Sequence, residues 1–248
     1  MTISKHQLLQ QQEYEFPYHY VPRLTPYFSQ SIVWEWSLNY IAALRLVLEK
    51  LGNMNYSRLI DVGTGDGRLV REISREYPQK TAEGTDYSTT VISLASALNP
   101  SLKFFQWDLI KKPLSEEYDA ALLIEVLEHL PPKDTRKFLF NLHHSLSSKS
   151  SVLVTVPHSN IPVQSKHFTH FSFTGLSSLV SPYFRISESY FLSLQNWQYQ
   201  IILKLLSNKL FTLSSPSLCQ FLFNYYWSNL FFTTENHCSR IFIKMHPK

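Results

Sequence analysis

The chain has 248 residues, of which 44% are hydrophobic, 15% aromatic and 17% charged. This composition can bury a core and excludes a disordered chain or a coiled coil, and the length fits one domain with additions. The net charge of +4 is scattered, and the longest basic run is Lys111-Lys112, which argues against nucleic acid as a partner.

The cysteines and the start of the chain bear on its compartment. Cys219 and Cys238 stand alone without CxxC spacing, which fits a reducing interior better than a disulfide framework. Met1 to Glu15 is polar, and no run of about 18 apolar residues occurs. We therefore expect a cytoplasmic protein without a transmembrane segment.

The first predicted element is an amphipathic helix over Ser31 to Leu51, with Ser31 as its N-cap and Gly52 just past its end. From Tyr56 onward, short apolar runs alternate with helical patterns. In chain order these segments are Arg58 to Val62, Arg68 to Tyr77, Ala82 to Thr85, Thr89 to Leu98, Lys103 to Phe105, Tyr118 to Ile124, Thr135 to Ser145 and Val152 to Val156. The alternation predicts a parallel sheet covered by helices on both faces.

The pattern changes after Pro157. A loop rich in His and Ser is followed by a predicted helix over Thr174 to Val180 and a strand over Phe184 to Tyr190. Gln195 to Phe232 is helical, aromatic and sparsely charged, and Arg240 to Met245 has the alternation of a closing strand.

Three of the six glycines, Gly63, Gly65 and Gly67, fall within five positions between a predicted strand and a helix. Glycine lets the backbone approach a ligand and adopt positive φ, and the N-terminus of the helix offers free N–H groups. Arg68 stands where a GxGxxG dinucleotide fingerprint requires glycine, which weakens a nicotinamide interpretation. The alternative is a turn that binds no ligand.

Two acids follow at the ends of the next two predicted strands. Asp86 lies about 20 residues past the glycine loop, where a carboxylate can accept hydrogen bonds from both ribose hydroxyls. Asp108 is placed to accept from an adenine amino group. Both acids would lie along the same carboxyl edge of the sheet as the glycines, although each alone could be a helix N-cap or a surface residue.

These motifs resemble those of the class I S-adenosylmethionine-dependent methyltransferases, from about Ile32 to Val156 and more loosely to Met245. The resemblance implies a three-layer, Rossmann-like α/β fold. Its sheet would have seven mostly parallel strands with helices on both faces, an antiparallel last strand and a helical insertion before that strand. The family often has Pro-Gly-Gly in the turn before the fifth strand, where this chain has Ser147 to Ser150.

The resemblance also implies a binding site for S-adenosyl-L-methionine beside the fourth-strand motif, Ile124 to Leu130. The residues that would bind this cofactor are Asp61, Gly63, Thr64, Gly65, Gly67, Asp86, Tyr87, Asp108, Leu109 and Glu125.

We expect four segments along the chain. Residues 1–30 form an aromatic segment that either closes over the cofactor as a lid or packs on the edge of the sheet. Residues 31–191 form the S-adenosylmethionine-binding core, residues 192–238 a helical insertion on the acceptor side, and residues 239–248 the closing strand.

The residues around the fourth-strand motif bear on catalysis. Methyl transfer from a sulfonium depends mostly on alignment and desolvation, whereas an acceptor hydroxyl must lose its proton or have its pKa lowered by a metal. On a helical turn, Glu125, Glu128 and His129 can converge on one side, and His167 or His170 arrives from the loop. The candidate catalytic residues are His129 and His167.

Oxygen and imidazole ligands suit magnesium, manganese and similar divalent ions. The pattern Glu-x-x-Glu-His with a later His is similar to that of ubiquinone-pathway O-methyltransferases and small-RNA 3′-terminal 2′-O-methyltransferases, two branches in which a divalent ion is bound. By that resemblance, Mg²⁺ or another divalent ion would be held by Glu125, Glu128, His129 and His167. Relatives without a metal share the pattern, so His129 as a metal-free base and a structural role stay open.

We therefore expect an S-adenosylmethionine-dependent O-methyltransferase with a small-molecule acceptor, for example a lipophilic compound or a secondary metabolite. The alternatives are an RNA 2′-O-methyltransferase with a divalent metal and a catalytically silent S-adenosylmethionine-binding protein. The aromatic insertion is interpreted as added core, as the face of a homodimer, or as a pocket or peripheral membrane contact for a lipophilic acceptor.

Overall fold

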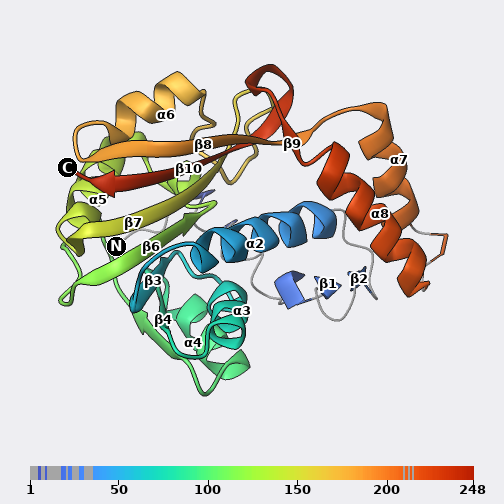
Figure 1. The fold of residues 1–248 in the computed structure, drawn as a ribbon. Coiled ribbons are helices and arrows are strands. Elements are labelled where there is room, and N and C mark those ends of the chain that lie inside the picture. Colours follow the sequence, from blue (N-terminus) through green and yellow to red (C-terminus); the bar gives the residue numbers. More distant parts are fainter. Residues whose placement is uncertain are drawn as a thin grey trace.

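The computed structural model describes residues 5–6, 9, 18–20, 22–23, 28–30, 36–208, 210–211, 213 and 215–248. Over these residues the chain forms a large twisted sheet with helices on both faces, and a pair of helices extends beyond one edge (Figure 1). No helix in these ranges is both long enough and apolar enough to cross a membrane.

In the described part of the chain, the large sheet has eight strands in the order β5-β4-β3-β6-β7-β10-β8-β9. Their bounds are β3 Arg58–Val62, β4 Thr81–Asp86, β5 Lys103–Gln106, β6 Tyr118–Ile124, β7 Leu146–Pro157, β8 Phe184–Leu194, β9 Phe232–Thr233 and β10 Cys238–Pro247. Strands β3 to β7 pair in parallel, and β10 is antiparallel to both β7 and β8. The expected fold with an antiparallel last strand is confirmed, and β9 is a two-residue addition at the edge.

The remaining elements surround this sheet. The helices are α2 Ser37–Gly52, α3 Arg68–Glu76, α4 Thr89–Leu98, α5 Pro132–His143, α6 Phe173–Val180, α7 Trp197–Leu206 and α8 Pro216–Asn229. Short 3₁₀ turns are η1 Tyr18–Tyr20, η2 Leu127–His129 and η3 Glu235–His237, and β1 Pro22–Arg23 pairs with β2 Ser29–Gln30.

Two boundary predictions need correction. Gly52 is the last residue of α2 rather than the residue after it, and a Cβ there would lie 2.8 Å from the hydroxyl of Tyr77. Ser147 to Ser150 do not form the turn before β7, because they lie within the strand as an irregularity of its pairing with β6. The predicted N-cap Ser31 lies outside the described residues.

A separate apolar core fills each face of the sheet. Phe242 of β10 packs into the cluster shared with α2 and α3, whereas Ile241 and Ile243 pack into the cluster shared with α5 and α6. This alternation follows from the two-residue period of a strand. Because both faces are covered, the site for a ligand is left to the edge of the sheet where the parallel strands end.

Helices α7 and α8 lie between β8 and β10 in the sequence and pack against each other beside the sheet (Figure 1). A buried polar network joins this insertion to α2. The amide of Asn39 donates to the hydroxyl of Tyr199 at 2.5 Å, and its carbonyl oxygen accepts from Tyr226 and from Ser193, the latter at 2.9 Å. Buried hydrogen-bonded groups of this kind fix one arrangement of the packed elements.

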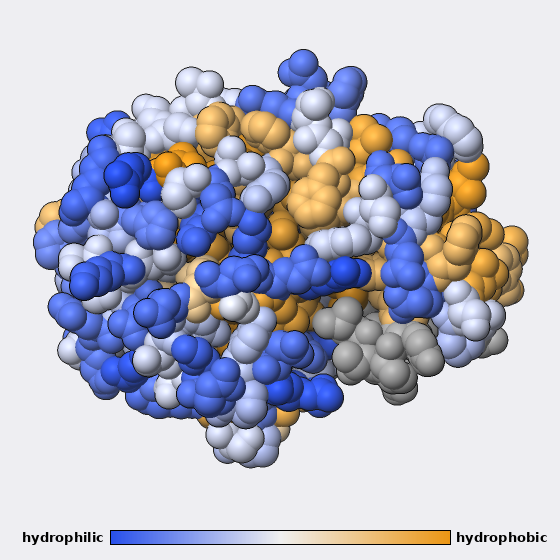
Figure 2. Space-filling view, in the orientation of Figure 1, coloured by the Kyte–Doolittle hydropathy of each residue, from blue (hydrophilic) through white to orange (hydrophobic). Residues whose placement is uncertain are grey.

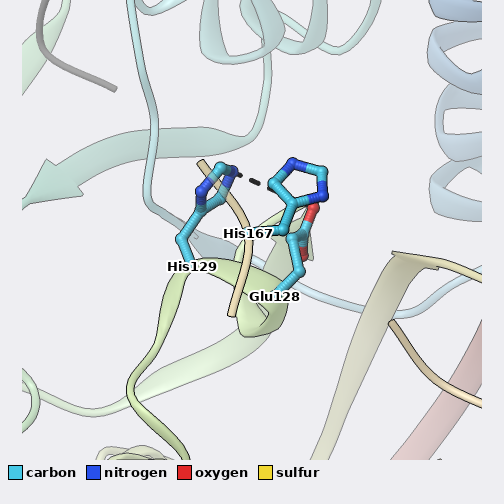
Figure 3. Close-up of side chains that lie close together, drawn as sticks. All are labelled: Glu128, His129 and His167. Carbon is cyan, nitrogen blue, oxygen red and sulfur yellow. Dashed lines mark ion pairs between the residues drawn. The ribbon is translucent and has the colours of Figure 1, made fainter. Parts of the chain in front are cut away.

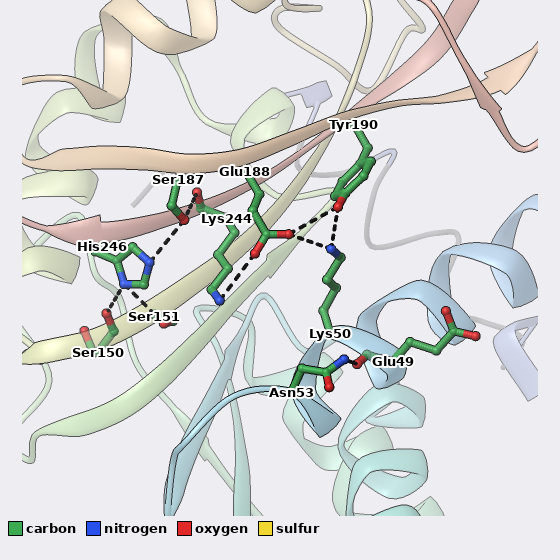
Figure 4. A network of polar contacts seen from close by, with 10 residues as sticks. All are labelled: Glu49, Lys50, Asn53, Ser150, Ser151, Ser187, Glu188, Tyr190, Lys244 and His246. Carbon is green, nitrogen blue, oxygen red and sulfur yellow. Dashed lines mark hydrogen bonds and ion pairs between the residues drawn. The ribbon is translucent and has the colours of Figure 1, made fainter.

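A second polar network ties the end of α2 to the strands (Figure 4). Lys50 Nζ donates to Glu188 Oε2 at 2.5 Å and to the hydroxyl of Tyr190 at 2.7 Å, and Lys244 Nζ lies 3.5 Å from Glu188 Oε1. The side chains of Lys50 and Glu188 are 20% and 34% exposed, so solvent screens their interaction and its contribution to stability is small.

Candidate active site

A cavity of about 800 Å³ lies at the carboxyl ends of the parallel strands. It brings together predicted site residues from segments far apart in the sequence. Those that line it are Asp61, Gly63, Thr64, Gly65, Asp86, Tyr87, Asp108, Leu109, Glu125, Glu128, His129 and His167. We call Asp61, Gly63, Gly65, Asp86 and Asp108 with their neighbours the glycine-loop half. Glu125, Glu128, His129, His167 and Arg240 form the histidine half.

The glycine loop turns through left-handed backbone conformations. Gly63, Gly65 and Gly67 have φ values of 75°, 57° and 79°. A Cβ at Gly63 would lie 2.7 Å from a methyl of Val126, so a side chain there is excluded by packing as well as by φ. Gly67 does not line the cavity; it precedes α3 and faces Phe104, whose ring is 2.6 Å from where a Cβ would be.

Two buried carboxyl groups flank this loop. Asp61 is 3% exposed and Asp86 is 9% exposed. Burial raises the pKa of Asp61 to about 7 and that of Asp86 to about 6, although the backbone N–H of Ser88 donates to Asp86 Oδ1 at 2.9 Å. A ligand that brings hydroxyl donors or positive charge to these carboxyls favours their ionised forms. An adenosyl sulfonium with a ribose diol brings both.

Asp108 differs from the other two acids because it is engaged locally. Its Oδ1 accepts from the backbone N–H of Ile110 at 3.0 Å, and its Oδ2 lies 3.1 Å from Lys111 Nζ. Leu109 beside it is buried, and Tyr87 lines the same end of the cavity. Both side-chain oxygens of Asp108 already have partners, so this residue also has a structural role in stabilising the turn after β5.

A compact cluster of one acid and two histidines lies in the histidine half (Figure 3). Glu128 and His129 come from η2, and His167 comes from the loop after β7. One ligand atom from each residue lies within 4.8 Å of the other two, and His129 Nε2 is 4.0 Å from Glu128 Oε1. We call these three residues the histidine cluster.

Hydrogen bonds assign the protons of the histidine rings. His129 Nδ1 lies 3.2 Å from the carbonyl oxygen of Lys166, which only accepts, so the proton is on Nδ1 and the lone pair on Nε2. His170 Nδ1 likewise donates to the carbonyl of Ile161 at 3.0 Å, and its Nε2 accepts from His167 Nδ1 at 2.8 Å. The lone pair of His167 is therefore on Nε2. His170, the alternative to His167 in the sequence, orients that ring from behind.

The donor set of this cluster fits a divalent cation. Glu128 is fully buried, and neither side-chain oxygen has a hydrogen-bond partner among the described residues. Burial raises the pKa of Glu128 well above its usual range, and it lowers the pKa of His167 to about 3, so this ring is neutral. One carboxyl and two imidazole lone pairs are common ligands of zinc, manganese and related ions, and a cation would ionise the orphaned carboxyl.

Glu125 lies outside the histidine cluster, and the four-ligand set with Glu125 stays a prediction. The helical turn begins at Leu127, and Glu125 before it has a left-handed φ of 57°, so helical spacing does not bring its side chain beside His129. Its Oε2 instead accepts from Arg240 Nε at 3.1 Å. No sequence pattern singled out Arg240 beyond its place at the start of the closing strand.

A described part of the N-terminal segment reaches the glycine-loop half. His19 of η1 lines the cavity, with Nδ1 2.9 Å from Oδ2 of the buried Asp66. Arg68 Nη1 donates to the carbonyl of His19 at 2.7 Å. Sequence reasoning missed Asp66 and Arg68 as anchors of this segment, while most of the predicted lid over residues 1–30 lies outside the described residues.

The fold and the cavity define a Rossmann-like protein with a ligand site at the carboxyl edge of its sheet. Residues 59–149 match the family described as a methyltransferase domain. A TehB-like SAM-dependent methyltransferase from Corynebacterium glutamicum, known from its crystal structure, has the same fold, with a TM-score of 0.53 and 13% identity over 84% of this chain and 88% of that chain.

Two curated relatives share part of the sequence. A trans-aconitate 2-methyltransferase from Deinococcus radiodurans is 30% identical over 103 residues, which are 41% of this chain and 38% of that protein. A small RNA 2′-O-methyltransferase from Tetrahymena thermophila is 27% identical over 151 residues, which are 53% of this chain and 34% of that protein. The match thus spans well under half of either relative. Residues 59–149 thus match a methyltransferase domain, and the described part of the chain has the fold of an S-adenosylmethionine-dependent methyltransferase.

Proposed function

We propose that this chain transfers the methyl group of S-adenosylmethionine to an oxygen of a small-molecule acceptor. The observation that carries the proposal is that one cavity joins the glycine loop and its buried acids to the histidine cluster. In the reaction the S–CH₃ bond breaks, an O–CH₃ bond forms, S-adenosylhomocysteine leaves as a neutral thioether, and the acceptor proton passes to a base.

The glycine-loop half would hold the donor. The left-handed turn at Gly63 would let the backbone approach the donor, and Asp86, which lines the cavity, would accept from the ribose hydroxyls. Asp61 adds a carboxyl whose ionised form the positively charged sulfonium favours. When bound, S-adenosylmethionine supplies an electrophilic methyl group that needs alignment more than activation.

The histidine cluster would act on the acceptor. Without a metal, His129 Nε2 can take the proton of an acceptor hydroxyl, and the ionised form of Glu128 at 4.0 Å would stabilise the resulting imidazolium. With a metal, Glu128, His129 and His167 would be its ligands, and the ion would lower the pKa of the acceptor hydroxyl. The two modes exclude each other at His129, because a single lone pair serves both.

A second candidate function is methylation of an RNA 2′-hydroxyl. It is favoured by the likeness to the small RNA 2′-O-methyltransferase, together with the acid and histidine donors of the cluster. Against it stands the scattered positive charge of the sequence, since RNA binding generally uses a clustered basic surface.

One experiment separates these candidates. The protein is incubated with methyl-labelled S-adenosylmethionine and either a metabolite extract or a small RNA, each with and without EDTA. The proposal expects label in the metabolite arm, and EDTA sensitivity there would identify a metal rather than a free base. Label in the RNA arm alone would favour the second candidate. Bound S-adenosylhomocysteine without transfer in any arm would indicate a catalytically silent binder.

The insertion of α7 and α8 would form the acceptor side, because Asn39, which anchors it, and Ser207 at the end of α7 both line the cavity. Apolar side chains gather on part of its outer surface (Figure 2). The exposed apolar side chains there are Trp197, Ile201, Leu205, Leu210, Phe211, Leu218 and Phe221. A second copy of the chain and a membrane surface are the two partners that suit such a patch. Light scattering tests the first, and vesicle co-sedimentation tests the second.

A further inference from the structure

An arginine stands in the histidine half without a role in the chemistry proposed above. Arg240 is near the start of β10, opposite Pro157 of β7 and Leu192 of β8. Its side chain lines the cavity and is 20% exposed. Placing a guanidinium in so enclosed a position costs desolvation free energy, which is recovered only if its N–H groups find acceptors.

The protein provides hydrogen-bond acceptors for only some of the N–H groups of this guanidinium. Nε donates to Glu125 Oε2 at 3.1 Å. Within the described ranges, no protein atom accepts a hydrogen bond from either terminal Nη group of Arg240, and its Cζ lies 6.0 Å from the ring centre of Trp36. Four of the five N–H bonds of a guanidinium belong to the Nη groups, and their planar fork matches the two oxygens of a carboxylate or phosphate.

Charges nearby also favour an anionic ligand. Lys166 lies on the same wall. Glu125 offsets the charge of Arg240. The donor sulfonium, and any cation in the histidine cluster, would add positive charge on the side where the acceptor must lie.

We infer that Arg240 binds an anionic oxygen group, a carboxylate or a phosphate, on the methyl acceptor. The inference rests on the proposed function and names the chemical class of its substrate. With the anion held by the Nη groups, a hydroxyl on the same acceptor is directed toward the histidine cluster. Arg240 is thus a binding residue that selects the acceptor, and the acid–base step stays with His129.

The test begins with acceptors sorted by charge. A metabolite extract is separated on an anion-exchange resin into anionic and non-anionic fractions, and each is incubated with the protein and methyl-labelled S-adenosylmethionine. The expected result is label only in products of the anionic fraction. Phosphatase treatment of that fraction beforehand distinguishes the two sources of charge, since it removes a phosphate monoester and leaves a carboxylate.

Variants then assign the effect to this side chain. In Arg240→Gln, KM for the anionic acceptor should rise about 10- to 100-fold, the size expected for a lost charge-assisted contact, and Arg240→Lys should recover part of it. Affinity for S-adenosylhomocysteine, measured by calorimetry, should change less than threefold. Arg185→Gln is the matched control, because Arg185 is an exposed arginine on the adjacent strand and does not line the cavity.

Three outcomes would overturn the inference. The first is label in the non-anionic fraction, and the second is an unchanged KM in Arg240→Gln. The third is a parallel loss of S-adenosylhomocysteine affinity with unchanged acceptor preference, which would mean that Arg240 holds the carboxylate of the donor instead. Absence of transfer in both fractions would contradict the proposed function itself, and calorimetric binding of S-adenosylhomocysteine tells these failures apart.

Discussion

The two halves of the cavity are built in different ways. The glycine-loop half consists of main chain and buried carboxyls at the ends of β3, β4 and β5, which follow one another closely in the sequence. The histidine half is assembled from side chains of η2, the loop after β7, and β10, and its Glu125–Arg240 contact joins residues 115 positions apart. The first half would hold a ligand through backbone shape, whereas the second would depend on a few titratable groups whose properties follow from burial.

This comparison predicts that the halves can be damaged independently. Glu128→Gln should lower kcat roughly 100- to 10,000-fold, because it removes the only carboxyl of the histidine cluster. Affinity for S-adenosylhomocysteine should stay within threefold of the wild type. Single-turnover transfer and calorimetry measure the two effects, and a large loss of cofactor affinity would contradict the division into halves.

A variant of the glycine-loop half should instead lose affinity for S-adenosylhomocysteine. Gly63→Ala places a Cβ 2.7 Å from Val126 at a φ of 75°, so S-adenosylhomocysteine affinity should fall at least about 100-fold through strain and displacement of the loop. Gly175→Ala is the control, since the nearest atom there is the Ser172 hydroxyl at 3.2 Å. Circular dichroism verifies the fold of both variants, and normal affinity in Gly63→Ala would contradict a ligand at this turn.

The two acids of the glycine-loop half, Asp86 and Asp108, should differ in how much their loss weakens ligand binding. Asp86→Asn is expected to weaken S-adenosylhomocysteine binding about 10- to 100-fold, because it loses hydrogen bonds to an ionised group. Asp108→Asn should weaken binding less, since Asp108 already has Ile110 N–H and Lys111 as partners. Calorimetry on both variants gives the order, and the reverse order would identify Asp108 as the main anchor.

The sequence predicts the two halves unequally, because the first is built from neighbouring segments and the second from distant ones. Helix α4 and strand β6 have the predicted bounds, because Ser88 caps the helix and the strand carries an unbroken apolar run over residues 120–124. The glycine loop is also predicted, because its conformation depends on residues close together in the sequence. The contact of Glu125 with Arg240 could not be predicted from the sequence. It depends on the backbone turn at Glu125 and on the register of β10 against β7.

Ligand binding to the glycine-loop half should also depend on pH. The pKa values of Asp61 and Asp86, about 7 and about 6 in the folded chain, lie above the ordinary value. Folding therefore favours their neutral forms, so this contribution to stability is full below about pH 4 and is lost as the pH rises through 7. A ligand that needs both ionised forms should bind roughly 100-fold more weakly at pH 5.5 than at pH 8, because the costs of ionising the two groups multiply.

Calorimetry with S-adenosylhomocysteine across this range measures the effect. Asp86→Asn should make the profile less steep between pH 5 and 6, because only Asp61 then titrates. An affinity that rises as the pH falls would show that these carboxyls do not face the ligand.

The smallest expected effect lies outside the cavity. Lys50→Met should lower the free energy of unfolding by no more than about 1 kcal/mol, because its ion pair with Glu188 is partly exposed and screened. Urea denaturation measures this change. Transfer activity should be unaffected, since Lys50 does not line the cavity.

A calorimetric titration of the wild-type chain with S-adenosylhomocysteine tests whether the glycine loop is a donor site. The account predicts binding of one molecule per chain, with loss of that binding in Gly63→Ala. Absence of binding to the folded wild-type chain, or equal binding by both, would contradict a donor site at the glycine loop.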